Sequence, residues 1–157
     1  MEPVTQISYR INQYKLLAEL DYFRQEFIMY SDSKHGDVKG WEVLRETEYH
    51  NVMKQEREKF LNQFNVTCES RGRYYILEPD LYLPPHIDFN TTCAINFILS
   101  GGESPVSYES GEYKYQNAIL DTTKLHWVQN TNNPRILFKI SIFDMKYEEL
   151  VWNIQNS

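Results

Sequence analysis

A histidine and an aspartate two positions apart, His86 and Asp88, are the residues of this chain best suited to bind a metal ion. They follow a pair of prolines, and positions i and i+2 of an extended strand point to the same face. An imidazole nitrogen and a carboxylate oxygen would therefore converge on one point. Two histidines and one carboxylate form a set that holds iron(II) and leaves coordination positions open. His126, in the strand-like segment 124–129, is the candidate for the second histidine.

A second interpretation stays open, in which His86 and Asp88 form a surface pair and His126 is a core histidine. With four histidines, a His-x-Asp pattern arises by chance roughly 0.2 times at an Asp frequency of about 5%. The strand-like setting and the arginine nine positions after His126 favour the metal site. Because imidazole must be neutral to bind a metal, we expect binding to weaken below about pH 6.

The last expected strand, 135–144, has two unlike faces. One face is wholly apolar and is made by Ile136, Phe138, Ile140 and Ile142. The other carries Arg135, Lys139 and Ser141, and charged side chains are rarely buried without a partner. Arg135 is the candidate for binding the far carboxylate of a 2-oxo acid, because its planar guanidinium group can donate two parallel hydrogen bonds to a carboxylate. Lys139 is the substitute if Arg135 points elsewhere, and the alternative for both is a solvent-exposed cation.

Two further positions are candidates for contacting the same acid. Asn96 interrupts the apolar run 93–99, and a buried amide must be hydrogen-bonded, either to such a ligand or to the backbone. Tyr74 or Tyr75 could give a hydroxyl from the preceding strand, 73–77. Strand alternation admits only one of the two, and we favour Tyr75.

The chain divides into a helical first part and a strand-rich second part. Apolar residues at spacings of three and four predict a helix over 12–30, with Asn12 as its N-cap, and a second helix over 48–64. Residues 31–40 have the composition of a loop. Short strands are expected at 40–44, 73–77, 81–83, 92–100, 106–109, 112–116, 118–120, 124–129 and 135–144, and a short helix at 146–154.

This order of elements predicts a single, mainly β domain over residues 1–157, a length sufficient for one core. We expect a helical part over 1–70, a jelly-roll core over 71–145 and a C-terminal helix or tail over 146–157. The core would be a cupin-like double-stranded β-helix, with the helices packed on one outer face.

Composition limits the partners of the protein. The net charge of −6 argues against a nucleic-acid partner, and no apolar run approaches the roughly 18 residues of a membrane-spanning helix. The N-terminus lacks the pattern of a secretory signal. Cys68 and Cys93 are expected to be free thiols in a reducing compartment. We therefore expect a cytoplasmic protein that binds neither nucleic acid nor membrane, and its oligomeric state stays open.

A family resemblance is carried by two stretches, LPPHIDFNTTCAINFILSGG and YQNAILDTTKLHWVQNTNNPRILFKISIF. With their His-x-Asp pair, later histidine and following arginine, they resemble the 2-oxoglutarate- and iron(II)-dependent oxygenases. The likeness is greatest to the aspartyl/asparaginyl β-hydroxylase and prolyl 4-hydroxylase-like branches and covers about residues 73–144. One departure is Leu137, which stands where many members of the family carry a serine hydroxyl to the co-substrate's carboxylate.

The resemblance implies a double-stranded β-helix in which His86, Asp88 and His126 hold iron(II) and Arg135 holds 2-oxoglutarate. It implies an enzyme that uses O2 to hydroxylate an amino-acid side chain or a small metabolite. A non-catalytic, cupin-like protein that binds a metal and a small acid is the alternative. A jelly-roll interaction module without a metal is a third possibility.

Overall fold

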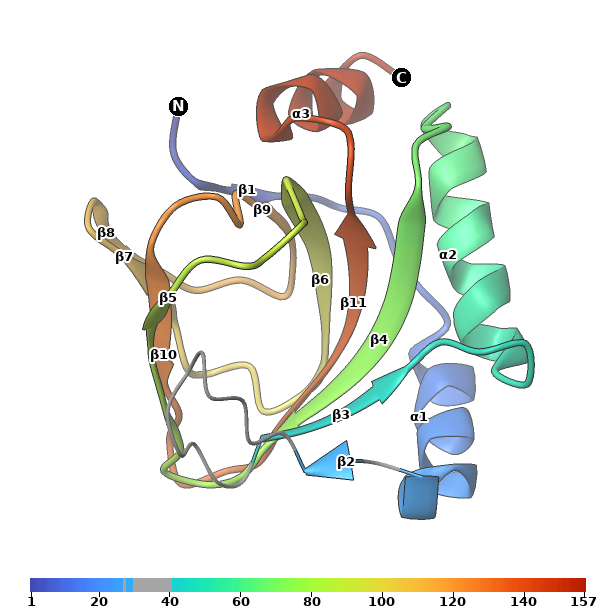
Figure 1. Cartoon of the computed structure of the whole chain (residues 1–157), viewed down its shortest axis with the longest axis vertical. Helices are drawn as coiled ribbons and strands as arrows, with labels where there is room; N and C mark the ends of the chain where they lie inside the picture. Colours follow the sequence, from blue (N-terminus) through green and yellow to red (C-terminus); the bar gives the residue numbers. More distant parts are fainter. Residues whose placement is uncertain (27, 30–40) are drawn as a thin grey trace.

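A computed structural model describes residues 1–26, 28–29 and 41–157 of the chain. Two antiparallel sheets pack against each other (Figure 1), with the strand orders β1-β9-β6-β11-β4-β3-β2 and β5-β10-β7-β8. The strands of the larger sheet are β1 (Val4–Gln6), β2 (Ile28–Met29), β3 (Trp41–Arg45), β4 (Ser70–Leu77), β6 (Cys93–Ser100), β9 (Asn117–Leu120) and β11 (Arg135–Ile142). Those of the smaller sheet are β5 (Tyr82–His86), β7 (Val106–Tyr108), β8 (Gly111–Tyr113) and β10 (His126–Gln129).

The strand β11 lies at the centre of the larger sheet, between β4 and β6, and its two faces serve two cores. Phe138, Ile140 and Ile142 are fully buried in the core beneath the helices. Leu137 belongs to the second core, between the two sheets. The alternation predicted for this strand is therefore confirmed, and it directs Arg135 and Lys139 to the space between the sheets.

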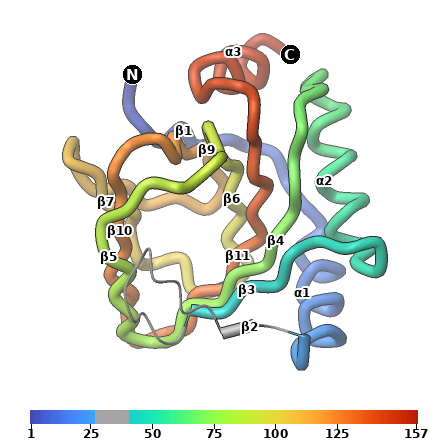
Figure 2. Tube along the Cα trace, in the orientation of Figure 1, coloured from blue at the N-terminus to red at the C-terminus, as the bar shows by residue number. Residues whose placement is uncertain are grey.

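Helices cover the outer face of the larger sheet, as predicted. The helices α1 (Gln13–Tyr22) and α2 (Asn51–Gln63) lie beside β3 and β4 (Figure 1). The helix α3 (Tyr147–Gln155) lies at the end of the molecule where both chain termini are found (Figure 2). This arrangement confirms the predicted fold class, a jelly roll with helices on one outer face.

The predicted helix over 12–30 is wrong in its second half. Asn12 caps α1 as expected, accepting a hydrogen bond from the Lys15 amide at 3.1 Å, but α1 ends at Tyr22. A short 3₁₀ helix, η1 (Arg24–Glu26), follows, and then β2 pairs with β3 at the edge of the sheet. Sheet pairing therefore overrides the helical spacing of the apolar residues. The last residues of that spacing, Phe27 and Tyr30, and the expected loop 31–40 lie outside the described residues.

Within the part of the chain that the structure describes, no helix is both long and apolar enough to cross a membrane. Cys68 and Cys93 are free thiols, and burial raises the pKa of Cys93 to about 12.

Candidate metal centre

The two candidate histidines lie side by side on neighbouring strands. His86 ends β5 and His126 begins β10, and the antiparallel register makes them direct partners. Their ring centroids are 4.4 Å apart. Tyr108 is the next partner of His126 across the sheet, and its ring stacks on that of His126 at 5.5 Å. The sheet itself therefore places the two imidazoles next to each other.

Backbone carbonyls determine which nitrogen of each ring faces the site. Nδ1 of His86 lies 2.8 Å from the Pro84 carbonyl oxygen, and Nδ1 of His126 lies 2.7 Å from that of Lys124. A carbonyl oxygen only accepts, so Nδ1 carries the proton in each ring. Each Nε2 then keeps a lone pair, and both Nε2 atoms lie 3.4 Å from the same oxygen, Oδ1 of Asp88.

Asp88 follows β5 and is held by groups from other segments. Its amide donates to the Thr122 carbonyl at 3.1 Å. Its second carboxylate oxygen, Oδ2, accepts a hydrogen bond from Nζ of Lys139 at 2.7 Å. Burial by itself would raise the pKa of Asp88, but the charge of Lys139 is the largest of the opposing effects, and together these hold this pKa well below its usual value. The carboxylate is therefore ionised and has one oxygen directed to the histidines.

The donor set fits a divalent transition metal. The ligand atoms of His86, Asp88 and His126 all lie within 4.8 Å of one another. Two imidazole nitrogens and one carboxylate oxygen suit iron(II) with open positions, and hydrogen bonds from Nδ1 to carbonyls are the usual outer-shell partners of metal-binding histidines.

A cavity of about 260 Å³ adjoins these three residues, between the two sheets. Arg135 lines it and is only 2% exposed. Its Nη1 donates to the Ser104 carbonyl at 2.8 Å and its Nη2 to the Tyr115 hydroxyl at 2.9 Å, while its Nε is buried without a partner in the described structure. Asn96 donates to the same hydroxyl at 2.8 Å, and its buried Oδ1 also lacks a partner there.

The remaining candidates separate by strand face. Tyr75 lines the cavity, whereas Tyr74 points to the helices and donates to Glu19 at 2.8 Å. Lys139 also lines the cavity, but it is paired with Asp88. Arg135 and Lys139 are four residues apart on β11, or about 13 Å along the strand. The seven candidate residues thus border one cavity. The two histidines and Asp88 lie near Lys139, whereas Arg135 lies farther along β11.

Sequence reasoning missed two features of the site. Tyr115, which contacts both Arg135 and Asn96, lies outside any strand, and nothing distinguishes it among the twelve tyrosines of the chain. The pairing of Lys139 with Asp88 was missed as well, because it joins residues 51 positions apart.

Comparison with known proteins finds similarity only in structure. No protein-family model matches the chain, and no curated protein matches its sequence. A prolyl-4-hydroxylase from Pseudomonas putida is 12% identical with a TM-score of 0.64, over 92% of this chain and 94% of that one. A Trichoplax adhaerens prolyl hydroxylase, in complex with a peptide fragment of the hypoxia inducible factor oxygen degradation domain, is 10% identical with a TM-score of 0.69. That match covers 95% of this chain and 85% of the other.

A third similar structure is an oxidoreductase of the 2OG-Fe(II) oxygenase family from Burkholderia pseudomallei. It is 13% identical with a TM-score of 0.59, over 88% of this chain and 84% of that one. The chain thus has the jelly-roll fold of the 2-oxoglutarate- and iron(II)-dependent oxygenases. The family resemblance is confirmed at the level of the fold, and two of these three structures are prolyl hydroxylases.

Proposed function

We propose that the protein is an iron(II)- and 2-oxoglutarate-dependent dioxygenase that hydroxylates an amino-acid side chain or a small metabolite. The observation that carries this proposal is the convergence of His86, Asp88 and His126 on one point beside a cavity that also contains a buried arginine. The similarity of the fold to enzymes of this class supports it.

Three side chains would hold the metal. The Nε2 atoms of His86 and His126 and Oδ1 of Asp88 are the ligands, and Lys139 keeps Asp88 ionised and fixed. With iron bound, such a centre would use O2 to convert 2-oxoglutarate into succinate and CO2, a step that takes up one oxygen atom. The other oxygen atom would be inserted into a C–H bond of the substrate. The open positions that two histidines and one carboxylate leave on the metal suit this chemistry.

Arg135 would bind the far carboxylate of 2-oxoglutarate. It is buried, its fork matches a carboxylate, and its Nε lacks a partner in the described structure. Tyr115 lies beside it and supplies a hydroxyl, a group that Leu137 does not provide at its own position. Asn96 is the third polar group at this end of the cavity.

The rest of the cavity wall would keep water away from the reacting atoms. Much of it is apolar, and Leu77 and Leu137 from the larger sheet meet Leu83 and Val128 from the smaller one. Tyr75 stacks against Trp41 at 5.7 Å on the same side of the cavity. A substrate would enter beside the metal ligands, since the Asp88 side chain is still 17% exposed.

The test is release of succinate from 2-oxoglutarate by the purified protein loaded with iron(II) under anaerobic conditions and then exposed to O2. We expect slow release without any other substrate, and none from His126→Ala. The control is Asp21→Ala, which removes an exposed carboxylate on α1 and should leave release unchanged. Binding of metal and 2-oxoglutarate without succinate release would contradict the proposal and match the non-catalytic alternative.

A further inference from the structure

Three cations form a row across the larger sheet, on the face that borders the cavity. Arg45 on β3 is the register partner of Arg73 on β4, and Arg73 is the partner of Lys139 on β11. All three line the cavity. Like charges on directly opposed residues repel each other, so this row is unfavourable unless anions neutralise it.

One anion is already present, but it neutralises only one member of the row. Lys139 is paired with Asp88 at 2.7 Å. Arg73 donates from Nη1 to the Tyr75 hydroxyl at 3.2 Å, which brings no negative charge, and its buried Nε has no partner in the described structure. Arg45 makes no hydrogen bond or ion pair with any residue that the structure describes.

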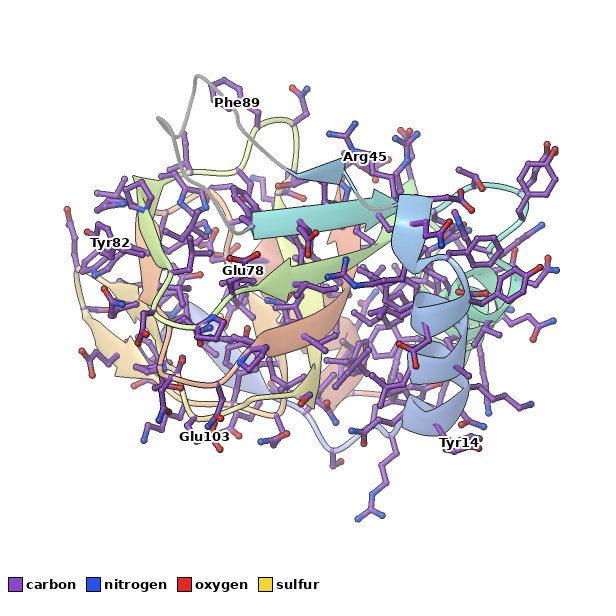
Figure 3. The ribbon with its side chains drawn as sticks, turned by 90° about the horizontal axis from the view of Figure 1, so that it is seen from below. Tyr14, Arg45, Glu78, Tyr82, Phe89 and Glu103 are labelled. Atoms are coloured by element: carbon purple, nitrogen blue, oxygen red, sulfur yellow. The ribbon has the colours of Figure 1, made fainter. Side chains whose placement is uncertain are left out.

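Two arginines on the opposite, helix-covered side of the larger sheet are paired. Arg57 makes two hydrogen bonds to Glu46, and Arg24 is paired with Glu42 at 2.8 Å. The carboxylates of these pairs do not line the cavity, and among the described residues that line it Asp88 is the one carboxylate. In Figure 3, Arg45 and Phe89, which also lines the cavity, lie toward the same edge of the molecule, away from Tyr14 and Glu103.

The described lining of the cavity is positively charged, in a protein whose net charge is −6. Its described lining contains four cations, Arg45, Arg73, Arg135 and Lys139, and one carboxylate, Asp88, which leaves three positive charges. Iron(II) and the 2-oxoglutarate dianion would cancel each other, so the proposed cofactor and co-substrate leave this excess unchanged. An anionic group on the substrate would balance it.

We propose that the substrate carries an oxyanion, a carboxylate or a phosphate, which Arg45 and Arg73 bind beside the metal ligands. That the bound molecule is a substrate rests on the proposed function, but binding of an oxyanion at this site does not require turnover. Two guanidinium groups on adjacent strands can bind an oxyanion with several charge-assisted hydrogen bonds. The Lys139–Asp88 pair connects this subsite to the metal ligands, so the bound anion would lie within a short distance of the reacting centre.

The test uses matched pairs of small probes, benzoate with benzamide and phenyl phosphate with phenol. Binding is followed by NMR through the arginine Nε–H signals of ¹⁵N-labelled protein, with Zn(II) and saturating 2-oxoglutarate present to occupy Arg135, and again in metal-free protein. We expect at least one oxyanion to bind about tenfold or more tightly than its neutral partner and to shift the Nε–H signal of Arg73. The carboxylate and phosphate arms identify which oxyanion is preferred.

Variants locate the site. Arg73→Gln and Arg45→Gln should each weaken oxyanion binding about tenfold, and Arg73→Lys should retain part of it. The matched control is Arg71→Gln, which removes an exposed cation from the same strand that does not line the cavity. Thermal unfolding of each variant confirms that it is folded.

Two results would overturn the inference: equal binding of the charged and neutral probes, or an equal loss in Arg71→Gln and Arg73→Gln. Failure of the proposed function is distinguishable from both. It would appear as lack of Zn(II) or 2-oxoglutarate binding in the same samples, or as absence of succinate release in the assay described above. Oxyanion binding to the metal-free protein through Arg45 and Arg73 would still support the subsite.

Discussion

The two oxygens of the Asp88 carboxylate have different partners. Oδ1 lies 3.4 Å from both histidine Nε2 atoms, and Oδ2 lies 2.7 Å from Nζ of Lys139. A lysine on the far side of the carboxylate leaves one oxygen for a metal and stabilises the ionised form. The same ion pair joins the smaller sheet to β11, so it serves both the site and the stability of the fold.

The pH dependence of stability should report on this pair. Because the pKa of Asp88 is lowered in the folded state, its ionised form contributes stability above the unfolded value of about 3.9, and this is lost as pH falls through the lower folded pKa. Lys139→Met removes the main cause of the lowering and leaves burial, which raises the pKa. We expect this variant to lose about 3 kcal/mol at neutral pH and to lose its remaining stability at higher pH than the wild type.

Urea unfolding from about pH 3 to about pH 7 measures this effect, with Lys54→Met, an exposed lysine on α2, as the control. Coinciding acid transitions in Lys139→Met and the wild type would show that the lysine does not stabilise the Asp88 carboxylate.

Arg135 is the residue on which the 2-oxoglutarate assignment depends. We expect Arg135→Gln to raise the dissociation constant of 2-oxoglutarate about 30-fold or more, because a buried charge pair is lost, corresponding to about 2 kcal/mol or more. Metal affinity should be unchanged, because Arg135 is far from the metal ligands. It lies about 13 Å along β11 from Lys139, the residue that is paired with Asp88. Calorimetric titration of the metal-loaded protein measures both. An unchanged 2-oxoglutarate requirement would move the assignment to Lys139.

At the scale of elements, Glu19 joins two helices to the sheet. From α1, its carboxylate accepts hydrogen bonds from the Val52 and Met53 amides at the start of α2, at 2.7 and 3.0 Å, and from the Tyr74 hydroxyl on β4 at 2.8 Å. Free amides at a helix N-terminus require acceptors, and an anion there also interacts favourably with the helix dipole.

Replacing Glu19 by Ala should therefore destabilise the fold without touching the metal site. Two amides and a buried hydroxyl lose their acceptor, so we expect a loss of about 3 kcal/mol in the free energy of unfolding. Urea unfolding measures it, with Glu26→Ala at an exposed position of η1 as the control. A loss of less than about 0.5 kcal/mol, the usual range for surface changes, would contradict this role.

The elements that sequence could predict are those with a clear local pattern. The alternation in β11 predicts its two faces, and Asn12 predicts the start of α1. The end of α1 could not be predicted, because the pairing of Ile28 with Val43 in the sheet decides it. That pairing is a long-range contact that the apolar spacing of the segment does not record.

The candidate site shows the same division. His86 and Asp88 could be found because their spacing is local, and His126 because it lies on a recognisable strand. Tyr115 and the Lys139–Asp88 pair could not, since they depend on how loops and strands far apart in the chain are brought together. The row of Arg45 and Arg73 likewise exists only through the register of β3 on β4.

At the scale of the whole molecule, the helices stabilise one face of the larger sheet and leave the other for the cavity (Figure 1). The metal ligands come from the smaller sheet and its adjoining loop, whereas Arg135 comes from the larger sheet. A metal and 2-oxoglutarate bound together would therefore link the two sheets.

Combined ligand binding should stabilise the whole fold. At about 100 times the dissociation constant, a ligand adds about 2.7 kcal/mol, which corresponds to a rise of about 5–10 °C in the unfolding temperature of a chain of this size. We expect this rise for Mn(II) with 2-oxoglutarate, and a much smaller one for 2-oxoglutarate alone, in differential scanning calorimetry. Equal shifts with and without Mn(II) would show that the metal adds no stability and would contradict the prediction.

The most direct measurement is anaerobic titration of the metal-free protein with Fe(II), with Co(II) as a spectroscopic substitute. We predict one tight site per chain in the wild type and no tight site in Asp88→Ala or His126→Ala, while Asp21→Ala binds as the wild type does. Full metal affinity in Asp88→Ala would contradict the assignment of the site, and with it the proposed chemistry.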